Sequence, residues 1–255
     1  MRIAVAGGTG VVGQHVVTAL EGAGHQAVVL ARSRGVDVTT GAGLDAALDG
    51  VDGVIDVTNI PTTGRKASTA FFEAASRHLL DSGRRAGIGH HVTLSVVGCD
   101  RVDFGYYIGK RRQEELVLDG RVPASVLRAT QFFEFAQQFT GRSWLPAVVP
   151  RMRTQPIAAG EVAAELVGLV TGPPVGRAPD LAGPREEQLV DMVRRLRRQG
   201  ASRRLVVPLT LPGRTGRAMA GGALLPEGPG PRGRQTFADW LQGAGAGASS
   251  AAAPS

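Results

Sequence analysis

Short apolar runs rich in β-branched residues alternate with longer segments of helical spacing over the first half of the chain. The runs predict buried strands at residues 2–6, 26–31, 51–57, 90–97 and 125–128. Between them, apolar residues recur with a helical period, which predicts helices at 11–23, 43–48, 67–84 and 106–118. Strands that alternate with helices form right-handed βαβ units, so we expect an α/β protein with a doubly wound parallel sheet and helices on both faces.

The pattern weakens after residue 140. Helical spacing predicts helices at 161–170 and 186–197, and a short helix at 237–241 is expected to anchor the end of the chain. Residues 243–255 are Gly, Ala and Ser apart from Pro254. Such a composition cannot form a core and predicts a disordered tail.

Charge is the compositional feature that bears on partners. The net charge is +7, yet residues 1–184 hold 18 basic and 17 acidic side chains, against 11 and 5 in residues 185–255. The excess therefore belongs to the C-terminal quarter of the chain. This distribution argues against a nucleic-acid partner.

The sequence has no candidate membrane span, signal segment or cysteine cluster, and this bears on its cellular compartment and on metal binding. No apolar run reaches the ~18 residues of a membrane span, and the opening MRIAVAGG is too short for a signal segment. Cys99 is the single cysteine, so neither an intrachain disulfide nor a cysteine-based zinc site is expected. His90 and His91 point to opposite faces of a predicted strand and cannot chelate one ion together. We therefore expect a cytoplasmic protein without a bound metal.

Three glycines with the spacing G-x-x-G-x-x-G lie between the first strand and the first helix. Composition alone makes this spacing weak evidence, because 36 of the 255 residues are glycine. Its position gives it meaning, since a strand-to-helix glycine turn lets a pyrophosphate approach the backbone and the free N–H groups of the helix. The expected dinucleotide contacts of this turn are Gly7, Gly8, Thr9, Gly10, Val11, Val12 and Gly13.

The end of the second strand indicates which dinucleotide is bound. NAD-binding proteins usually place Asp or Glu about 20 residues beyond the glycines, to bind the ribose 2′-hydroxyl. Here the corresponding residues are Arg32, Ser33 and Arg34. Two guanidinium groups and a hydroxyl suit the 2′-phosphate, so NADP(H) is predicted in preference to NAD(H).

The most specific pattern is Tyr106 followed four residues later by Lys110, in a chain with two tyrosines and two lysines. Residues four apart share one face of a helix. An ammonium near the phenol is expected to lower its pKa, which makes Tyr106 usable in proton transfer. Tyr107 is adjacent, and the pattern leaves open which ring faces the site. An amphipathic helix with a packed tyrosine and an exposed lysine is the alternative.

Two further sets of polar residues lie near this pair. Ser95 ends a predicted strand, where parallel sheets hold ligands, and is a candidate hydrogen-bond donor to a substrate carbonyl. A satisfied serine at a strand end is the alternative. Glu114 and Glu115 are expected to form surface ion pairs with Arg111 and Arg112.

Five segments in order, GGTGVVG, ARSRGVD, LSVVGCD, YYIGKRRQEELV and LRATQFFEF, resemble the atypical short-chain dehydrogenase/reductases of the NmrA-like, NAD(P)-binding group. The resemblance covers roughly residues 1–200. It implies a Rossmann-type fold, NADP(H) at the glycine turn, and Tyr106 as proton donor, with Lys110 as its ribose-binding partner and Ser95 as the substrate-orienting hydroxyl.

The same resemblance implies a position for three more residues. Asn59, after the strand at 51–57, would lie near the nicotinamide ribose. Gln131 and Phe132 would face the substrate pocket. We expect one domain over residues 1–242, with a core at 1–140 and a small substrate-binding part at 141–242.

The sequence therefore predicts an NADPH-dependent oxidoreductase that reduces a carbonyl or quinone of a small, largely apolar substrate. The alternative is a non-catalytic redox sensor of the NmrA type, which binds NADP(H) without turning over a substrate. Either protein is compatible with a homodimer.

Overall fold

The computed structural model describes residues 1–140, 146–200 and 205–250 and divides the chain into two compact units. Unit 1 comprises Met1–Ala129 and Ala159–Asp180, and unit 2 comprises Thr130–Ala158 and Leu181–Ser255. The expected boundary at residue 140 differs from this division. Helix α5 (Ala159–Thr171) belongs to unit 1 because it packs against α1 (Val11–Gly22).

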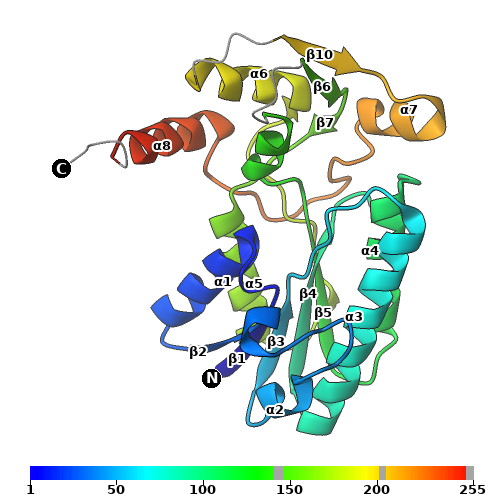
Figure 1. Cartoon of the computed structure of the whole chain (residues 1–255), viewed down its shortest axis with the longest axis vertical. Coiled ribbons are helices and arrows are strands. Elements are labelled where there is room, and N and C mark those ends of the chain that lie inside the picture. The colour runs from blue at the N-terminus through cyan, green and yellow to red at the C-terminus, as the bar shows by residue number, and fades with distance from the viewer. Residues whose placement is uncertain (141–145, 201–204, 251–255) are drawn as a thin grey trace. The chain divides into compact units, whose positions relative to one another are not determined.

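Unit 1 is built on a parallel sheet, as predicted, with six strands where the sequence predicted five. The strand order is β2-β1-β3-β4-β5-β8, and the strands are β1 (Arg2–Ala6), β2 (Gln26–Leu30), β3 (Gly53–Asp56), β4 (His90–Val96), β5 (Ala124–Ala129) and β8 (Gly176–Arg177). Helices α1 and α5 lie on one side of the sheet, and α3 (Arg65–Ala86) and α4 (Gly105–Leu118) on the other (Figure 1). The chain order reverses at β1, which pairs with β2 and β3. Ligands of such sheets bind at this point, beyond the carboxyl ends of the strands.

The sheet face covered by α3 and α4 changes character from one edge to the other. Near β1 and β2 it is apolar, and the core there includes Ala4, Leu30, Val54 and Leu79 together with Leu44 and Leu48 of the short helix α2 (Leu44–Leu48). Further along, the buried residues are polar: Asp56 on β3 and His91, Thr93 and Ser95 on β4. Helix α4 therefore packs on a sheet surface that requires hydrogen-bond partners.

The two adjacent histidines lie on opposite faces, as the alternation of a strand requires. His90 hydrogen-bonds the Gly172 carbonyl and the Ser125 hydroxyl, whereas His91 interacts electrostatically with Asp56. In the described ranges no group of three or more His, Cys, Asp or Glu residues is placed to hold a metal ion.

Unit 2 is held together by short strands and an aromatic cluster. Strands β6 (Ala147–Pro150) and β10 (Val206–Leu209) pair in parallel, and β7 (Arg153–Thr154) pairs antiparallel with β9 (Glu187–Gln188). The remaining elements are the 3₁₀ helix η2 (Phe133–Phe139) and helices α6 (Leu189–Gln199), α7 (Gly213–Gly221) and α8 (Phe237–Ser250).

Helix α8 begins where the anchoring helix was expected. Its Phe237 and Trp240 rings stack with centroids 5.6 Å apart, and both contact Phe133. Its backbone continues as a helix through residues 243–250, in the segment expected to be disordered, whereas residues 251–255 lie outside the described residues. The alanines of that stretch alternate with glycines, which disfavour helix, so its composition does not explain the helix.

Elsewhere the predicted elements of unit 1 lie close to their observed bounds, and the unpredicted ones are short. The 3₁₀ helix η1 (Arg32–Arg34) and strand β8 are the additions there. No helix of the described ranges combines the length and the apolar character needed to cross a membrane.

The β1–α1 turn yields a test of the fold. A Cβ atom on Gly13 would lie 2.1 Å from the Gly7 carbonyl oxygen, whereas one on Gly22, at the other end of α1, would meet nothing within 4 Å. We expect Gly13→Ala to lower the free energy of unfolding by about 2–4 kcal/mol, because backbone must move. Gly22→Ala should leave it unchanged or raise it by up to about 1 kcal/mol. Denaturant unfolding measures both, and equal effects would contradict the turn geometry.

Candidate functional site

The glycine turn has the geometry of a phosphate-binding loop. Gly7 adopts a left-handed conformation with φ of 82°, and a Cβ atom there would lie 2.8 Å from the Val57 carbonyl oxygen. The Gly10 N–H donates to the Gly7 carbonyl at 3.0 Å, and α1 then begins without a side-chain cap. The first turn of the helix thus keeps backbone N–H groups free of any side-chain cap, and such groups are typical of anion sites.

The residues of the glycine turn differ in how far they are exposed to solvent. Thr9, Gly10 and Val11 are exposed, whereas Val12 and Gly13 are buried. Val12 belongs to the core of unit 1. Its side chain therefore packs inside the protein, and any contact that it makes with a ligand must come from its backbone.

The end of β2 leaves two arginines exposed. Arg32, Ser33 and Arg34 form η1 and are all exposed. The carboxylate of Asp37, nearby in the loop, accepts hydrogen bonds from the Thr39 hydroxyl at 2.6 Å and from the Thr39 N–H at 2.8 Å. Hydrogen bonds from Thr39 keep the pKa of Asp37 below its usual value. This carboxylate is occupied within its own turn, whereas the exposed side chains of η1 are two guanidinium groups and a hydroxyl.

Tyr106 meets the loop that follows β3. Its hydroxyl donates to Asn59 Oδ1 at 2.8 Å, and its ring packs edge-on against Phe72, with centroids 5.7 Å apart. Burial, followed by the neighbouring Tyr107 and Cys99, raises the pKa of Tyr106. The expected lowering by Lys110 is therefore wrong for this structure, and Tyr106 is a neutral phenol that can donate a proton.

Tyr107 is directed elsewhere. It is 7% exposed and packs against Phe104, with ring centroids 5.8 Å apart. Of the two tyrosines, Tyr106 has its hydroxyl at the loop beside the glycine turn. This geometry favours Tyr106 where the sequence left both open.

Lys110 is turned into the protein. Its ammonium donates to the Leu94 carbonyl at 2.9 Å and to Gln113 Oε1 at 2.8 Å, and it lies 4.4 Å from the centroid of the Phe72 ring. Burial lowers its pKa to about 8, and the negative charge of Asp56 opposes this change. The expected Tyr106–Lys110 partnership is absent among these contacts, because Phe72 is the group that both side chains touch.

Ser95 is also directed inward. It is 2% exposed, its hydroxyl lies 3.9 Å from Cys99 Sγ, and it hydrogen-bonds Glu114. The expected role in orienting a substrate does not match this position, because the alternation of β4 places the Ser95 side chain beneath α4. The alternative, a satisfied serine at a strand end, is what the structure shows.

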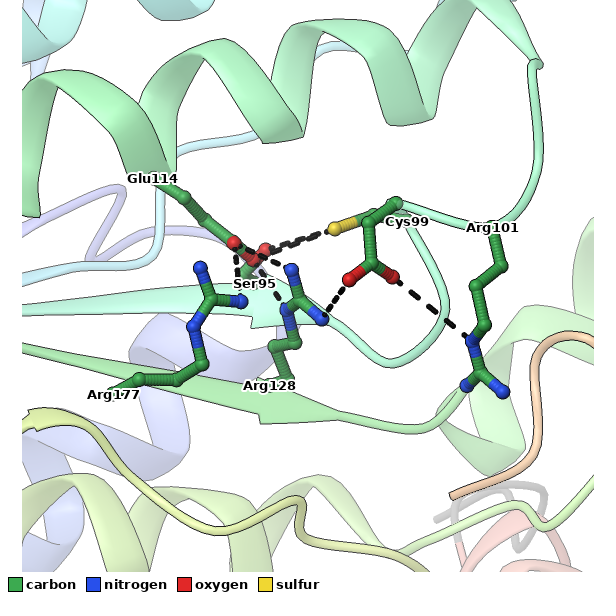
Figure 2. Close-up of polar contacts among 7 residues, drawn as sticks. Ser95, Cys99, Arg101, Glu114, Arg128 and Arg177 are labelled. Carbon is green, nitrogen blue, oxygen red and sulfur yellow. Dashed lines mark hydrogen bonds and ion pairs between the residues drawn. The ribbon is translucent and has the colours of Figure 1, made fainter. Parts of the chain in front are cut away.

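Sequence reasoning missed a buried ion network beneath α4. Glu114, expected on the surface, is 2% exposed and forms a bidentate pair with Arg128, at 2.8 and 2.7 Å. Arg128 also binds Asp100 at 2.7 Å, and Arg177 reaches Glu114 at 3.0 Å. Figure 2 shows Arg128 and Arg177 converging on Glu114, with the Cys99 thiol on the same carboxylate. An arginine within the apolar run SVLRA was the available signal.

The ion network shifts the pKa of the carboxyl group at its centre. Burial opposes ionisation of Glu114, but hydrogen bonds from Arg128 and Ser95 prevail and lower its pKa. The neighbouring Glu115 follows the surface expectation, with its exposed carboxylate 3.1 Å from Arg112. Arg111 instead pairs with Asp103 at 2.8 Å.

Gln131 and Phe132 belong to unit 2 and are half-buried. The Gln131 side-chain carbonyl accepts a hydrogen bond from the Thr154 hydroxyl. Its amide nitrogen has no partner among the described residues. Phe132 precedes η2.

Comparisons with known proteins agree with the fold of this chain. The fold is the Rossmann-type fold of the short-chain dehydrogenase/reductases and nucleotide-sugar epimerases. Residues 3–99 match the model of the NAD dependent epimerase/dehydratase family.

One curated relative and three solved structures illustrate the likeness. A (4-alkanoyl-5-oxo-2,5-dihydrofuran-3-yl)methyl phosphate reductase from Streptomyces griseus is 32% identical over 160 residues, 57% of this chain and about half (51%) of that protein. A short-chain dehydrogenase/reductase superfamily protein from Agrobacterium tumefaciens with bound NAD is 17% identical over 98% of both chains, with a TM-score of 0.71. An NADPH-dependent quinone oxidoreductase from Escherichia coli complexed with NADPH is 17% identical over 95% of this chain and 99% of that chain, with a TM-score of 0.68. A UDP-N-acetylglucosamine 4-epimerase from Bacillus cereus is 17% identical over 94% of this chain and 95% of that chain, with a TM-score of 0.68.

Adjacent glutamates on α4 provide a matched test of the buried network. We expect Glu114→Gln to lower the free energy of unfolding by about 3–5 kcal/mol at pH 7, because it leaves the Arg128 charge poorly compensated in the interior. Glu115→Gln removes an exposed pair and should cost less than about 1 kcal/mol. Because the pKa of Glu114 is lowered in the folded protein, its stabilisation is present above pH ~4.3 and is lost as the pH falls through the lower, folded value. Denaturant unfolding measures both variants; equal losses at pH 7 would contradict this assignment, and the difference between the variants should shrink at pH 3.

Proposed function

We propose that the protein is a cytoplasmic NADPH-dependent oxidoreductase of the NmrA-like short-chain dehydrogenase/reductase type. Its substrate is a small, largely apolar molecule whose carbonyl or quinone group is reduced. The observation that carries the proposal is the link between the glycine turn and Tyr106. Gly7 packs against Val57, and two residues further on Asn59 receives the Tyr106 hydroxyl at 2.8 Å. A proton donor thus lies beside the turn that fits a pyrophosphate.

The residues of this chain can do the acid half of such a reduction. Bound NADPH supplies the hydride. The Tyr106 phenol carries a proton at neutral pH, as an unperturbed tyrosine does, and burial raises its pKa further. It transfers that proton to the substrate oxygen that gains charge. Asn59 Oδ1 orients the hydroxyl beforehand through the hydrogen bond at 2.8 Å, and the Tyr106 proton leaves this acceptor when a substrate oxygen replaces it.

The curated relative adds a second candidate substrate class. Its name describes an alkanoyl group on a 5-oxo-dihydrofuran ring, a structure in which a carbon–carbon double bond is conjugated with carbonyl groups. Hydride addition to such a double bond creates an enolate oxygen, which requires the same proton donor. A panel of quinones, ketones and conjugated lactones, followed by NADPH absorbance, distinguishes the two classes.

The two tyrosines provide the decisive test of catalysis. We expect Tyr106→Phe to lower kcat/KM for NADPH oxidation by about 10²–10⁴-fold, because it removes the transferred proton, while the dissociation constant for NADPH stays within about 3-fold. Tyr107→Phe should retain activity within about 3-fold, because its ring packing is preserved. If Tyr106→Phe retained full activity, Tyr106 would not be the acid. If the wild-type protein bound NADPH but oxidised it with no member of the panel, the non-catalytic redox sensor would be favoured.

Cofactor preference is tested at the end of β2. We expect Arg32→Gln to weaken NADPH binding by about 10–100-fold, because a charge-assisted hydrogen bond to the 2′-phosphate contributes roughly 1.5–3 kcal/mol. NADH binding by the same variant is the internal control and should be unchanged. Fluorescence titration with both dinucleotides measures the effect, and an equal loss for NADH would show that Arg32 does not read the phosphate.

A further inference from the structure

Lys110 has its hydrogen-bonding capacity taken up inside the protein. It is 3% exposed, and its ammonium donates to the Leu94 carbonyl at 2.9 Å and to Gln113 Oε1 at 2.8 Å. The remaining side of the ammonium lies over the Phe72 ring, 4.4 Å from its centroid. An ammonium has three N–H donors, so these three acceptors match its capacity.

Gln113 connects this ammonium to a buried carboxylate. Its amide nitrogen donates to Asp56 Oδ2 at 2.8 Å, while Asp56 Oδ1 accepts the Thr58 N–H at 2.9 Å. Asp56 and Gln113 are both 0% exposed. The amide must therefore point its oxygen at Lys110 and its nitrogen at Asp56. Each group in this chain donates to the next, from the Lys110 ammonium through the Gln113 amide to the Asp56 carboxylate.

Asp56 is the counter-charge that this ammonium has available. Of the other ionisable groups that act on Lys110, Glu114 is already bound by Arg128 and Arg177, and Cys99 is a thiol. From β4, His91 acts on Asp56. From α3, the contact with Lys110 is the uncharged Phe72 ring. A lysine that left this position would leave Asp56 and Gln113 buried without their compensation, which costs several kcal/mol in typical buried pairs.

We propose that Lys110, Gln113 and Asp56 form a buried relay that positions α4 on β3 and β4, and that dinucleotide binding does not use the Lys110 ammonium. The relay places Tyr106, one helical turn before Lys110, at Asn59. This inference rests on the proposed function in so far as NADPH is the dinucleotide. It differs from the role that the Tyr–Lys spacing implied, because the lysine acts as a positioning residue through the helix that carries Tyr106.

The donor that links Gln113 to Asp56 can be removed without changing the shape of the side chain. Gln113→Glu places two carboxylates within hydrogen-bond distance, and they share a proton only at low pH. We expect its Tm in the ligand-free protein to fall increasingly below that of the wild type between pH 5 and pH 8, by roughly 5–10 °C at the upper end.

A double variant, Asp56→Asn with Gln113→Glu, is the matched rescue. The amide introduced on β3 donates to the carboxylate introduced on α4, and this carboxylate accepts from Lys110 directly. The double variant should recover the wild-type pH dependence of the Tm. Failure of the double variant to recover, or wild-type behaviour of Gln113→Glu alone, would overturn the relay.

Dinucleotide binding tests the second half of the proposal. Lys110→Met and the double variant Asp56→Asn with Lys110→Met, which removes both charges, should bind NADPH within about 3-fold of the wild type in fluorescence titration, because no ribose contact is lost. The double variant covers the case in which Lys110→Met does not fold. A loss of 10-fold or more in a folded variant would overturn the inference. If the wild-type protein itself did not bind NADPH, the proposed function would fail, while the Tm measurements would still decide the relay.

Discussion

Every charge that α4 buries against the sheet must meet an opposite charge or a complete set of hydrogen bonds there, and this constraint shapes the central part of unit 1. The underside of the helix carries Lys110, Gln113 and Glu114, all at most 3% exposed. Their partners on the sheet are Asp56 on β3 for Gln113, the Leu94 carbonyl on β4 for Lys110 and Arg128 on β5 for Glu114. Apolar packing would tolerate small rotations of α4, whereas these directional contacts do not. The position of Tyr106 at Asn59 follows from them.

The fold could be predicted from the sequence because hydrophobic periodicity determines it locally. Runs such as RIAVA and QAVVL predict strands, of which β1 is buried and the edge strand β2 is half-buried, and the glycine turn marks where the first helix begins. The sequence did not predict that α5, which follows the expected boundary at residue 140, belongs to unit 1. Its assignment to unit 1 depends on packing against α1, which is a long-range contact.

The site was predictable in its residue types and less so in its directions. The glycine turn and the arginines after β2 follow from the order of strands and loops. Asn59 was expected near the site only from the family resemblance, and its contact with Tyr106 was not predicted. The orientation of Lys110 and Ser95 does not, because it depends on which polar partners the neighbouring strands provide. Spacing along a helix specifies that Tyr106 and Lys110 share a face. Phe72, Gln113 and Asp56 decide where on that face each polar group points.

The thiol in the network of Figure 2 has a consequence for the chemistry of the whole chain. Cys99 is fully buried, and burial together with the Glu114 carboxylate raises its pKa to about 12. Oxidants and alkylating reagents attack the thiolate, so Cys99 should be unreactive toward both while the protein is folded. Since Cys99 is the sole cysteine, the rate at which a thiol reagent modifies the protein reports how often the contact between α4 and the sheet opens. It also means that Cys99 does not act as a redox-responsive thiol as long as α4 stays packed on the sheet.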